Sequence, residues 1–322
     1  MKSRILLLFL FLTASLILMS CKQNKSNECE DSYIKALGII EQNSIKKNDI
    51  NWSDIKRDVK DSIKEFRSND DIYRAIRYTL ELINDGHSFF VSYRKDSSNH
   101  TVSSFKNVTI PEFEARIIDG DIGYLNLHGI YANDSITDIY QMEVRKALLR
   151  LDSSSKLSGW IIDLRNHSGG ELTCETLGLS PLFEQPLIGI TCDNKNSYNT
   201  LVCAKSYFNF GQIRLDSLIF DSTLQNRHKK IAVLIGKSTV SVGEFLALTF
   251  KFQNNTKLFG SKTKGKTSHL KMFEFQSRAR LLLAVMYYCD KDKNILKEGI
   301  IPDIECDSTK CLSLAVDWIK KQ

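Results

Sequence analysis

The chain has 322 residues, of which 42% are hydrophobic and 25% charged, the balance of a globular protein with a full core in one or two domains. Only 4 prolines and 16 glycines occur, and neither a collagen nor a heptad period is present, which excludes the fibrous, coiled-coil and disordered classes. The formal net charge of +6 is scattered along the chain, so the composition predicts no nucleic-acid partner.

Residues 1–20 predict a lipoprotein signal peptide. Lys2 and Arg4 precede an apolar run over 5–18, which is shorter than the roughly 20 residues that a membrane span needs. The run ends in Leu-Met-Ser-Cys, a pattern similar to a bacterial lipobox, so we expect Cys21 to be lipidated and residues 21–33 to form a polar tether. The sequence therefore predicts an exported lipoprotein of the cell envelope, at the outer membrane or the periplasmic face, with an N-terminal lipid anchor in the membrane. An uncleaved signal anchor is the alternative.

The cysteines and histidines predict no metal site. If Cys21 is lipidated, seven of the 8 cysteines remain, and an odd number excludes a fully paired disulfide framework. No C-x-x-C or H-E-x-x-H motif occurs, and Cys306 and Cys311 have no histidines at zinc-binding spacing. Most cysteines have apolar neighbours, which indicates small buried side chains. We expect neither a metal nor a cofactor.

Residues 34–95 predict a small N-terminal helical region. Apolar residues recur there at spacings of three and four, most clearly over 70–83, and Ser68 with the following Asn-Asp supplies the N-cap signal. This helix is followed by the segment Asp-Gly-His-Ser at 85–88. The polar composition of residues 96–109 predicts a linker.

Residues 110–322 predict one α/β domain. We expect strands over 122–127, 160–164, 231–235 and 281–285, antiparallel strands around 187–220, and helices over 134–151, 242–252 and 312–319. The apolar runs at 160–164 and 231–235 are typical of strands buried on both faces. In the helix over 134–151 the inward side chains should be Ile139, Met142, Ala147 and Leu148. The alternation of strands and helices predicts right-handed crossovers.

Two loops that follow buried strands have residues suited to catalysis. The segment 163–170 ends in Gly169 and Gly170, and paired glycines at a strand-to-helix turn let backbone N–H groups approach a ligand. The segment 237–244 places Ser241 at the start of a helix, where it is either an N-cap or a nucleophile.

A third loop, over 260–267, matches the phosphate-loop pattern G-x-x-x-x-G-K-[ST]. A phosphate loop opens into a helix, whereas residues 272–275 alternate like a strand. A nucleotide-binding protein is therefore an alternative that requires a helix after residue 267.

Taken together, the loops resemble peptidase family S41, the tail-specific or C-terminal-processing proteases. Residues 163–170 resemble the motif D-L-R-N-N-x-G-G, residues 239–244 the nucleophile turn T-A-S-[AS]-[GS]-E, residues 263–266 T-x-G-K, and residues 299–303 G-I-x-P-D. The stretch between residues 91 and 122 is too short for an inserted PDZ domain, and residues 85–90 resemble the D-G-H-[ST] segment of the PDZ-less, tricorn-like branch.

This resemblance implies a fold and an activity. The fold is a crotonase/ClpP-like α/β (α+β) core over 110–322, with the small helical region before it. The activity is that of a serine endopeptidase, which hydrolyses polypeptide substrates through an acyl-enzyme on Ser241. The alternative is a catalytically inactive ligand- or peptide-binding protein on the same scaffold, because a fold does not fix function.

The resemblance also suggests roles for individual residues. Two oxyanion donors are needed, and the candidates are the N–H of Val242 and that of Gly169 or Gly170. Two residues remain candidates for the general base. Lys266 matches the lysine of a Ser–Lys dyad, while His87 matches the histidine base of the tricorn-like branch. The sequence slightly favours His87, because the glutamine expected soon after the lysine is replaced by His269 and Leu270.

Two further charged sites are expected to have supporting roles. Glu244 should cap or orient the nucleophile turn. Asp163 and Arg165 should form a structural ion pair.

Overall fold

The computed structural model describes residues 28–63, 65–92, 112–132, 134–154, 156–204, 207–217, 224–275 and 279–321. The predicted signal peptide, Cys21 and the linker over 96–109 lie outside these ranges. The contacts divide the chain into an N-terminal unit, Met1–Arg94 with Leu270–Val285, and a main unit, Lys95–His269 with Met286–Gln322.

The N-terminal unit contains a helix over 28–43, α2 (Trp52–Ser62), α3 (Asn69–Ile83) and β1 (Phe89–Val91). Ser68 caps α3 as predicted, and the Asp71 carboxylate accepts a hydrogen bond from the Ser68 N–H at 3.0 Å. The first helix begins at residue 28, so residues 28–33, which we expected in the tether, are helical.

Residues 270–285 group with the N-terminal unit, although the sequence placed them in the 110–322 domain. The physical reason is strand pairing: β1 runs antiparallel to β12 (Arg280–Cys289), with Phe90 opposite Leu281. β11 (Ser268–Glu274) also pairs with β12. A pairing across almost 200 residues leaves no local pattern in the sequence.

The main unit contains the buried sheet that the apolar runs predict. Its strand order is β13-β10-β9-β4-β3-β2, and every neighbouring pair is parallel except β2 with β3. All five residues of β4 are buried, as are all of β9 except its first. The strands are β2 (Glu114–Ile118), β3 (Ile122–Asn126), β4 (Gly159–Asp163), β9 (Lys230–Ile235), β10 (Thr256–Gly260) and β13 (Ile304–Glu305).

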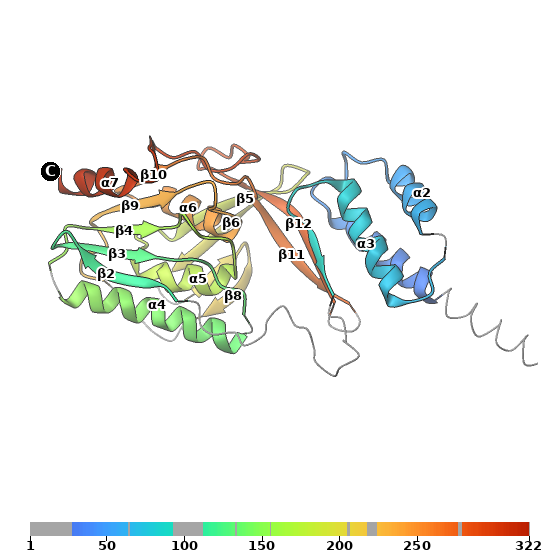
Figure 1. Cartoon of the computed structure of the whole chain (residues 1–322), viewed down its shortest axis with the longest axis horizontal. Helices are drawn as coiled ribbons and strands as arrows, with labels where there is room; N and C mark the ends of the chain where they lie inside the picture. The colour runs from blue at the N-terminus through green and yellow to red at the C-terminus, as the bar shows by residue number, and fades with distance from the viewer. Residues whose placement is uncertain are drawn as a thin grey trace, which may run out of the picture. The chain divides into compact units, whose positions relative to one another are not determined.

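Helices cover both faces of this sheet (Figure 1). On one face, Trp160 and Ile162 of β4 pack with α4 (Asp134–Ser154), α5 (Leu172–Leu179) and α6 (Val242–Lys251). On the other face, Ile161 packs with α7 (Cys311–Lys320). Successive strand residues point to opposite faces, which is why β4 is apolar throughout. The predicted α/β fold is confirmed.

One side chain in α4 does not lie where the sequence predicted. Ala147 and Leu148 are buried as expected, but Ile139 is 47% exposed, so its inward assignment is wrong. The neighbouring Tyr140 is buried instead. At this point of α4, the buried face is therefore shifted by one residue from the face that the sequence predicted.

The antiparallel strands expected around 187–220 are present as β5 (Leu187–Cys192), β6 (Tyr198–Ala204), β7 (Tyr207–Phe210) and β8 (Ile213–Ser217). The loop over 260–267 leads into the strand β11 and not into a helix, so it lacks the helix N-terminus that a phosphate loop uses. This excludes the nucleotide-binding alternative. No helix in the described ranges is both long and apolar enough to cross a bilayer.

Candidate active site

The candidate site forms where two neighbouring strands of the main sheet end. β4 ends at Asp163 and β9 at Ile235, and the two strands are parallel partners. Because the carboxyl ends of parallel strands meet at one edge, the loops that follow them leave the sheet together. The loop after β4 carries Gly169 and Gly170, and the loop after β9 enters α6 through Ser241.

Ser241 has an unfavourable backbone conformation. It is the N-cap of α6, with φ of 54° and ψ of −111°. Most of the other non-glycine residues with positive φ in the described ranges are Asn or Asp, which tolerate that region. A serine there costs on the order of 1–3 kcal/mol and persists only where its surroundings enforce it. Strained strand-to-helix turns of this kind expose nucleophilic serines in other hydrolases.

The carboxylate of Glu244 holds this turn in place, as the sequence predicts. Glu244 is completely buried. Its Oε2 accepts hydrogen bonds from the N–H groups of Ser241 (3.0 Å) and Lys266 (2.8 Å). Its Oε1 accepts from the Thr263 hydroxyl (2.6 Å) and the Gly265 N–H (2.7 Å). Four donors compensate the cost of burying the charge, and they join the nucleophile turn to the loop over 263–266.

Gly169 lies directly against Ser241. A methyl group added to its Cα would come within 3.3 Å of the Ser241 Cβ and 2.6 Å of the Tyr131 hydroxyl oxygen, and its φ of 102° also favours glycine. The Val240 N–H donates to the His167 carbonyl at 2.9 Å, so a backbone hydrogen bond joins the two loops.

The three candidate oxyanion donors differ in their hydrogen bonding. The Gly169 N–H donates to Nδ1 of His167 at 3.3 Å. Within the described part of the chain, the N–H groups of Gly170 and Val242 donate to no acceptor. Of the three candidates, Gly170 and Val242 are thus the two whose N–H groups are not taken up by a protein acceptor in the described ranges.

A buried His–Glu pair beneath this loop was not anticipated from the sequence. His167 and Glu175 are both completely or almost completely buried, and His167 Nε2 contacts Glu175 Oε2. The other Glu175 oxygen accepts from the Ile130 N–H at 3.3 Å. One feature of the sequence could have indicated the pair: Glu175 is the single acid in the apolar helix α5, and a buried carboxylate needs a partner.

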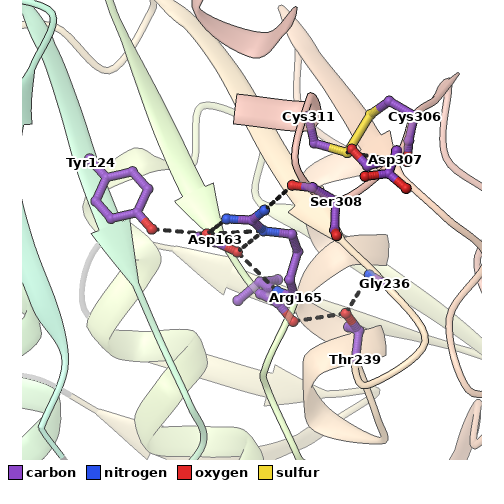
Figure 2. A network of polar contacts seen from close by, with 10 residues as sticks. Tyr124, Asp163, Arg165, Gly236, Thr239, Cys306, Asp307, Ser308 and Cys311 are labelled. Carbon is purple, nitrogen blue, oxygen red and sulfur yellow. Dashed lines mark hydrogen bonds and ion pairs between the residues drawn. A yellow bond between two sulfur atoms is a disulfide. The ribbon is translucent and has the colours of Figure 1, made fainter. Parts of the chain in front are cut away.

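Asp163 and Arg165 form the structural ion pair that the sequence predicts (Figure 2). Arg165 Nη2 lies 2.6 Å from Asp163 Oδ2, which also accepts from the Tyr124 hydroxyl at 2.9 Å. Arg165 Nη1 donates to the Ser308 carbonyl at 2.6 Å. Burial and the Asp163 carboxylate raise the pKa of Tyr124 far above its ordinary value, so the phenol stays protonated and donates. The pair fixes the start of the glycine loop, since Asp163 also accepts the Arg165 N–H at 3.1 Å.

Ser308 lies inside the short loop that a disulfide closes between Cys306 and Cys311 (Figure 2). The sequence does not reveal this pair, because a separation of five residues does not distinguish a disulfide from two separate thiols. The prediction of small buried side chains is confirmed for five other cysteines, which are Cys29, Cys174, Cys192, Cys203 and Cys289.

The two candidate bases lie in different units. Lys266 belongs to the main unit, where its N–H is bound by Glu244 and its side chain is only half-buried. His87 belongs to the N-terminal unit and is buried. The Asp85 carboxylate fixes the backbone around His87, since it accepts from the N–H groups of His87 (2.9 Å) and Ser88 (2.7 Å). The Ser88 hydroxyl in turn accepts from the Ala284 N–H at 2.8 Å.

His269, which stands near the position of the missing glutamine, is part of an aromatic cluster. Its ring stacks on Phe210 with centroids 4.8 Å apart and meets Tyr288 edge-on. Burial lowers the pKa of His269 to about 4, so the ring is neutral at physiological pH. Burial and the Glu244 carboxylate raise the pKa of Tyr288 well above its ordinary value. Both groups stay uncharged there.

Within the described ranges no group of three or more His, Cys, Asp or Glu side chains is arranged to hold a metal ion. The chemistry that the described site offers is that of a serine at a strained turn with backbone donors beside it.

The chain is similar in sequence to known proteins. The sequence profile described as peptidase family S41 matches residues 121–306, which is more than half of the chain and includes both loops of the site. The nisin-resistance protein of Lactococcus lactis subsp. lactis is 26% identical over 272 residues, which cover 84% of this chain and 80% of the relative.

Two solved structures have the same fold. A lipoprotein from Streptococcus agalactiae superimposes with a TM-score of 0.75 at 22% identity, covering 91% of this chain and 96% of the other. The photosystem II D1 C-terminal processing protease superimposes with a TM-score of 0.54 at 15% identity, covering 86% and 92%.

Proposed function

Because the chain belongs to peptidase family S41, we propose that it is a serine endopeptidase that hydrolyses polypeptides through an acyl-enzyme on Ser241. The observation that carries this proposal is the positive φ of Ser241 at the start of α6, with Gly169 packed against its side chain. An N-cap serine needs no such conformation, because N-caps ordinarily have extended backbone. A nucleophile that must project from a sharp turn does.

The proposed reaction follows from the positions of these groups. Ser241 Oγ attacks the peptide carbonyl carbon and gives its proton to the base, and the carbonyl oxygen becomes an oxyanion that accepts hydrogen bonds from the Gly170 and Val242 N–H groups. The base returns the proton to the amine of the leaving segment as the peptide bond breaks, and the acyl-enzyme ester on Ser241 remains. Water then hydrolyses this ester. The loss of one oxyanion donor typically reduces kcat by about 10²–10³-fold.

We favour His87 as the base over Lys266. A lysine acts as a base near neutral pH when burial disfavours its ammonium form, and Lys266 is only half-buried. Histidine is the side chain that most often serves as a general base. The Asp85 carboxylate accepts the His87 N–H and the Ser88 hydroxyl accepts the Ala284 N–H, so the backbone that carries His87 is fixed.

We also propose that the protein is exported and held at the cell envelope by a lipid on Cys21. The segment before Cys21 has the pattern of a lipoprotein signal peptide, and the similar protein from Streptococcus agalactiae is described as a lipoprotein. The substrates would then be polypeptides outside the cytoplasm. The relative named for nisin resistance makes nisin a reasonable substrate to include in the first assays.

The test is cleavage of an unfolded protein and of nisin by residues 22–322, beside the variants Ser241→Ala, His87→Ala and Lys266→Ala. We expect cleavage by the wild type, none by Ser241→Ala, and a loss of at least about 10²-fold in whichever of the other two removes the base. If the folded wild type cleaves neither substrate and no serine-reactive probe labels Ser241, the chain is a binding protein on a peptidase scaffold.

A further inference from the structure

We propose that His167 is a positioning residue of the oxyanion hole. Its imidazole, oriented by Glu175, holds the Gly169 amide inward and so leaves the Gly170 and Val242 N–H groups as the donors to the substrate oxygen. The inference rests on the proposed peptidase activity and deepens it, because it names the group that decides which backbone amides face the reaction.

The imidazole contacts three segments that meet at the site. It accepts the Gly169 N–H from the glycine loop and contacts Glu175 of α5. It also fills the space beside the first turn of α6, since a methyl group on Gly243 would lie 2.8 Å from Nδ1 of His167. The ring is completely buried. It therefore sets the spacing between the glycine loop and the helix that begins after Ser241.

The contacts also fix which ring nitrogen carries the proton. Nδ1 accepts the Gly169 N–H, so the hydrogen of the neutral ring is on Nε2, where it is donated to Oε2 of Glu175. Oε1 of Glu175 is occupied by the Ile130 N–H. The carboxylate is thus held in place itself, and it holds the imidazole in the form that can accept at Nδ1.

The peptide unit between Ser168 and Gly169 is consequently fixed at both ends. The Ser168 carbonyl accepts from the Tyr131 hydroxyl at 2.8 Å, and on the opposite side of the planar unit the Gly169 N–H is bound by His167. With this unit unable to rotate, the next amide in the chain, that of Gly170, is the one left for a ligand.

The geometry at Nδ1 suggests a pair of variants that separate its two contacts. Asn and Asp side chains accept the N–H two residues later in an Asx-turn, which is the spacing between residues 167 and 169. His167→Asn therefore keeps an acceptor for the Gly169 N–H and loses the partner of Glu175. His167→Gln places its polar group at the position of Nε2, so it keeps a partner for Glu175 and loses the acceptor.

Both variants are compared with the wild type and again in a Glu175→Gln background, because His167→Asn alone leaves a buried carboxylate short of one partner. We expect His167→Asn to keep kcat within about 5-fold and His167→Gln to lose at least about 10-fold, with KM changed less than about 2-fold in both. A purely structural role for His167 would instead lower Tm and activity together in whichever variant is less stable.

Hydrogen exchange of the Gly169 amide gives a second measurement that does not need activity. We expect it to be protected in the wild type and in His167→Asn, and to exchange at least about 10-fold faster in His167→Gln. Equal kcat and equal exchange in the two variants overturn the inference. If the folded wild type is inactive and Ser241→Ala does not differ from it, the proposed function fails, while the exchange comparison still decides whether His167 holds the amide.

Discussion

Replacing Glu244 with glutamine exchanges one carboxylate oxygen for an NH₂ group and leaves the volume of the side chain unchanged. In the wild type both oxygens accept two hydrogen bonds each, from Ser241 and Lys266 on one side and from Thr263 and Gly265 on the other. A glutamine has one acceptor oxygen. In one orientation its NH₂ group faces the N–H groups of Ser241 and Lys266; in the other it faces the Gly265 N–H and the Thr263 hydroxyl, which can rotate to accept.

The size of the effect follows from these four bonds. A hydrogen bond to a charged acceptor contributes about 1.5–3 kcal/mol; at least one is lost in a buried position, and those that remain have an uncharged acceptor. Some relaxation of the loop offsets part of that loss, so we expect Glu244→Gln to lower the free energy of unfolding by about 3 kcal/mol. At about 2–4 °C per kcal/mol for a unit of this size, Tm falls by about 6–12 °C.

The assay is urea unfolding followed by circular dichroism, with cleavage measured on the same samples at a temperature where both proteins are folded. Glu298→Gln is the matched control, since Glu298 is 85% exposed and forms only a surface ion pair with Lys262. Such pairs contribute about 0–1 kcal/mol. Because Glu244 also fixes the Ser241 backbone, kcat should fall by at least about 10-fold in Glu244→Gln and remain unchanged in the control.

If Glu244→Gln unfolds within about 0.5 kcal/mol of the wild type, the four hydrogen bonds do not stabilise the turn as the structure indicates. If stability falls but kcat does not, Glu244 supports the fold without orienting the nucleophile.

Three other predictions concern separate parts of the molecule. Glycine relieves the positive φ at position 241 while alanine does not, so Ser241→Gly should be about 1 kcal/mol more stable than Ser241→Ala in urea unfolding, and neither should cleave substrate; equal stability would count against backbone strain. Reduction of the Cys306–Cys311 disulfide opens a six-residue loop and should lower the free energy of unfolding by about 2 kcal/mol, an effect absent from the Cys306→Ala/Cys311→Ala variant. Because burial lowers the pKa of His269 to about 4, the unfolded chain binds a proton there at a higher pH than the folded chain does. The contribution of His269 to the free energy of unfolding is therefore complete above about pH 6.5 and falls by at most about 3 kcal/mol as the pH drops to about 4. The decrease in the free energy of unfolding over this pH range should be smaller in His269→Phe.

Elements defined by local pattern could be predicted from the sequence. The apolar run at Trp160–Leu164 predicts a strand buried on both faces, and it is one. The periodicity of α3 and its Ser68 cap have the same local origin. The four ordered motifs identify peptidase family S41, and the profile match over 121–306 agrees. Each of these signals lies within a few consecutive residues, where side-chain period and backbone preference act directly on the chain.

The interactions that organise the site depend on distant parts of the chain. Glu244 is bound by donors about 20 residues later, and β1 pairs with a strand near residue 281. The sequence offered both Gly169 and Gly170 as oxyanion donors, and only the hydrogen bond to His167 distinguishes them.

The sequence thus determined the fold class, the family and the turn that begins α6 at Ser241, because local patterns and short motifs specify them. The tertiary structure decided the strain at Ser241, the buried pair of His167 with Glu175 and the grouping of residues 270–285 with the N-terminal helices. Each of these depends on which distant groups satisfy a buried donor or acceptor, and that choice is made only when the chain packs.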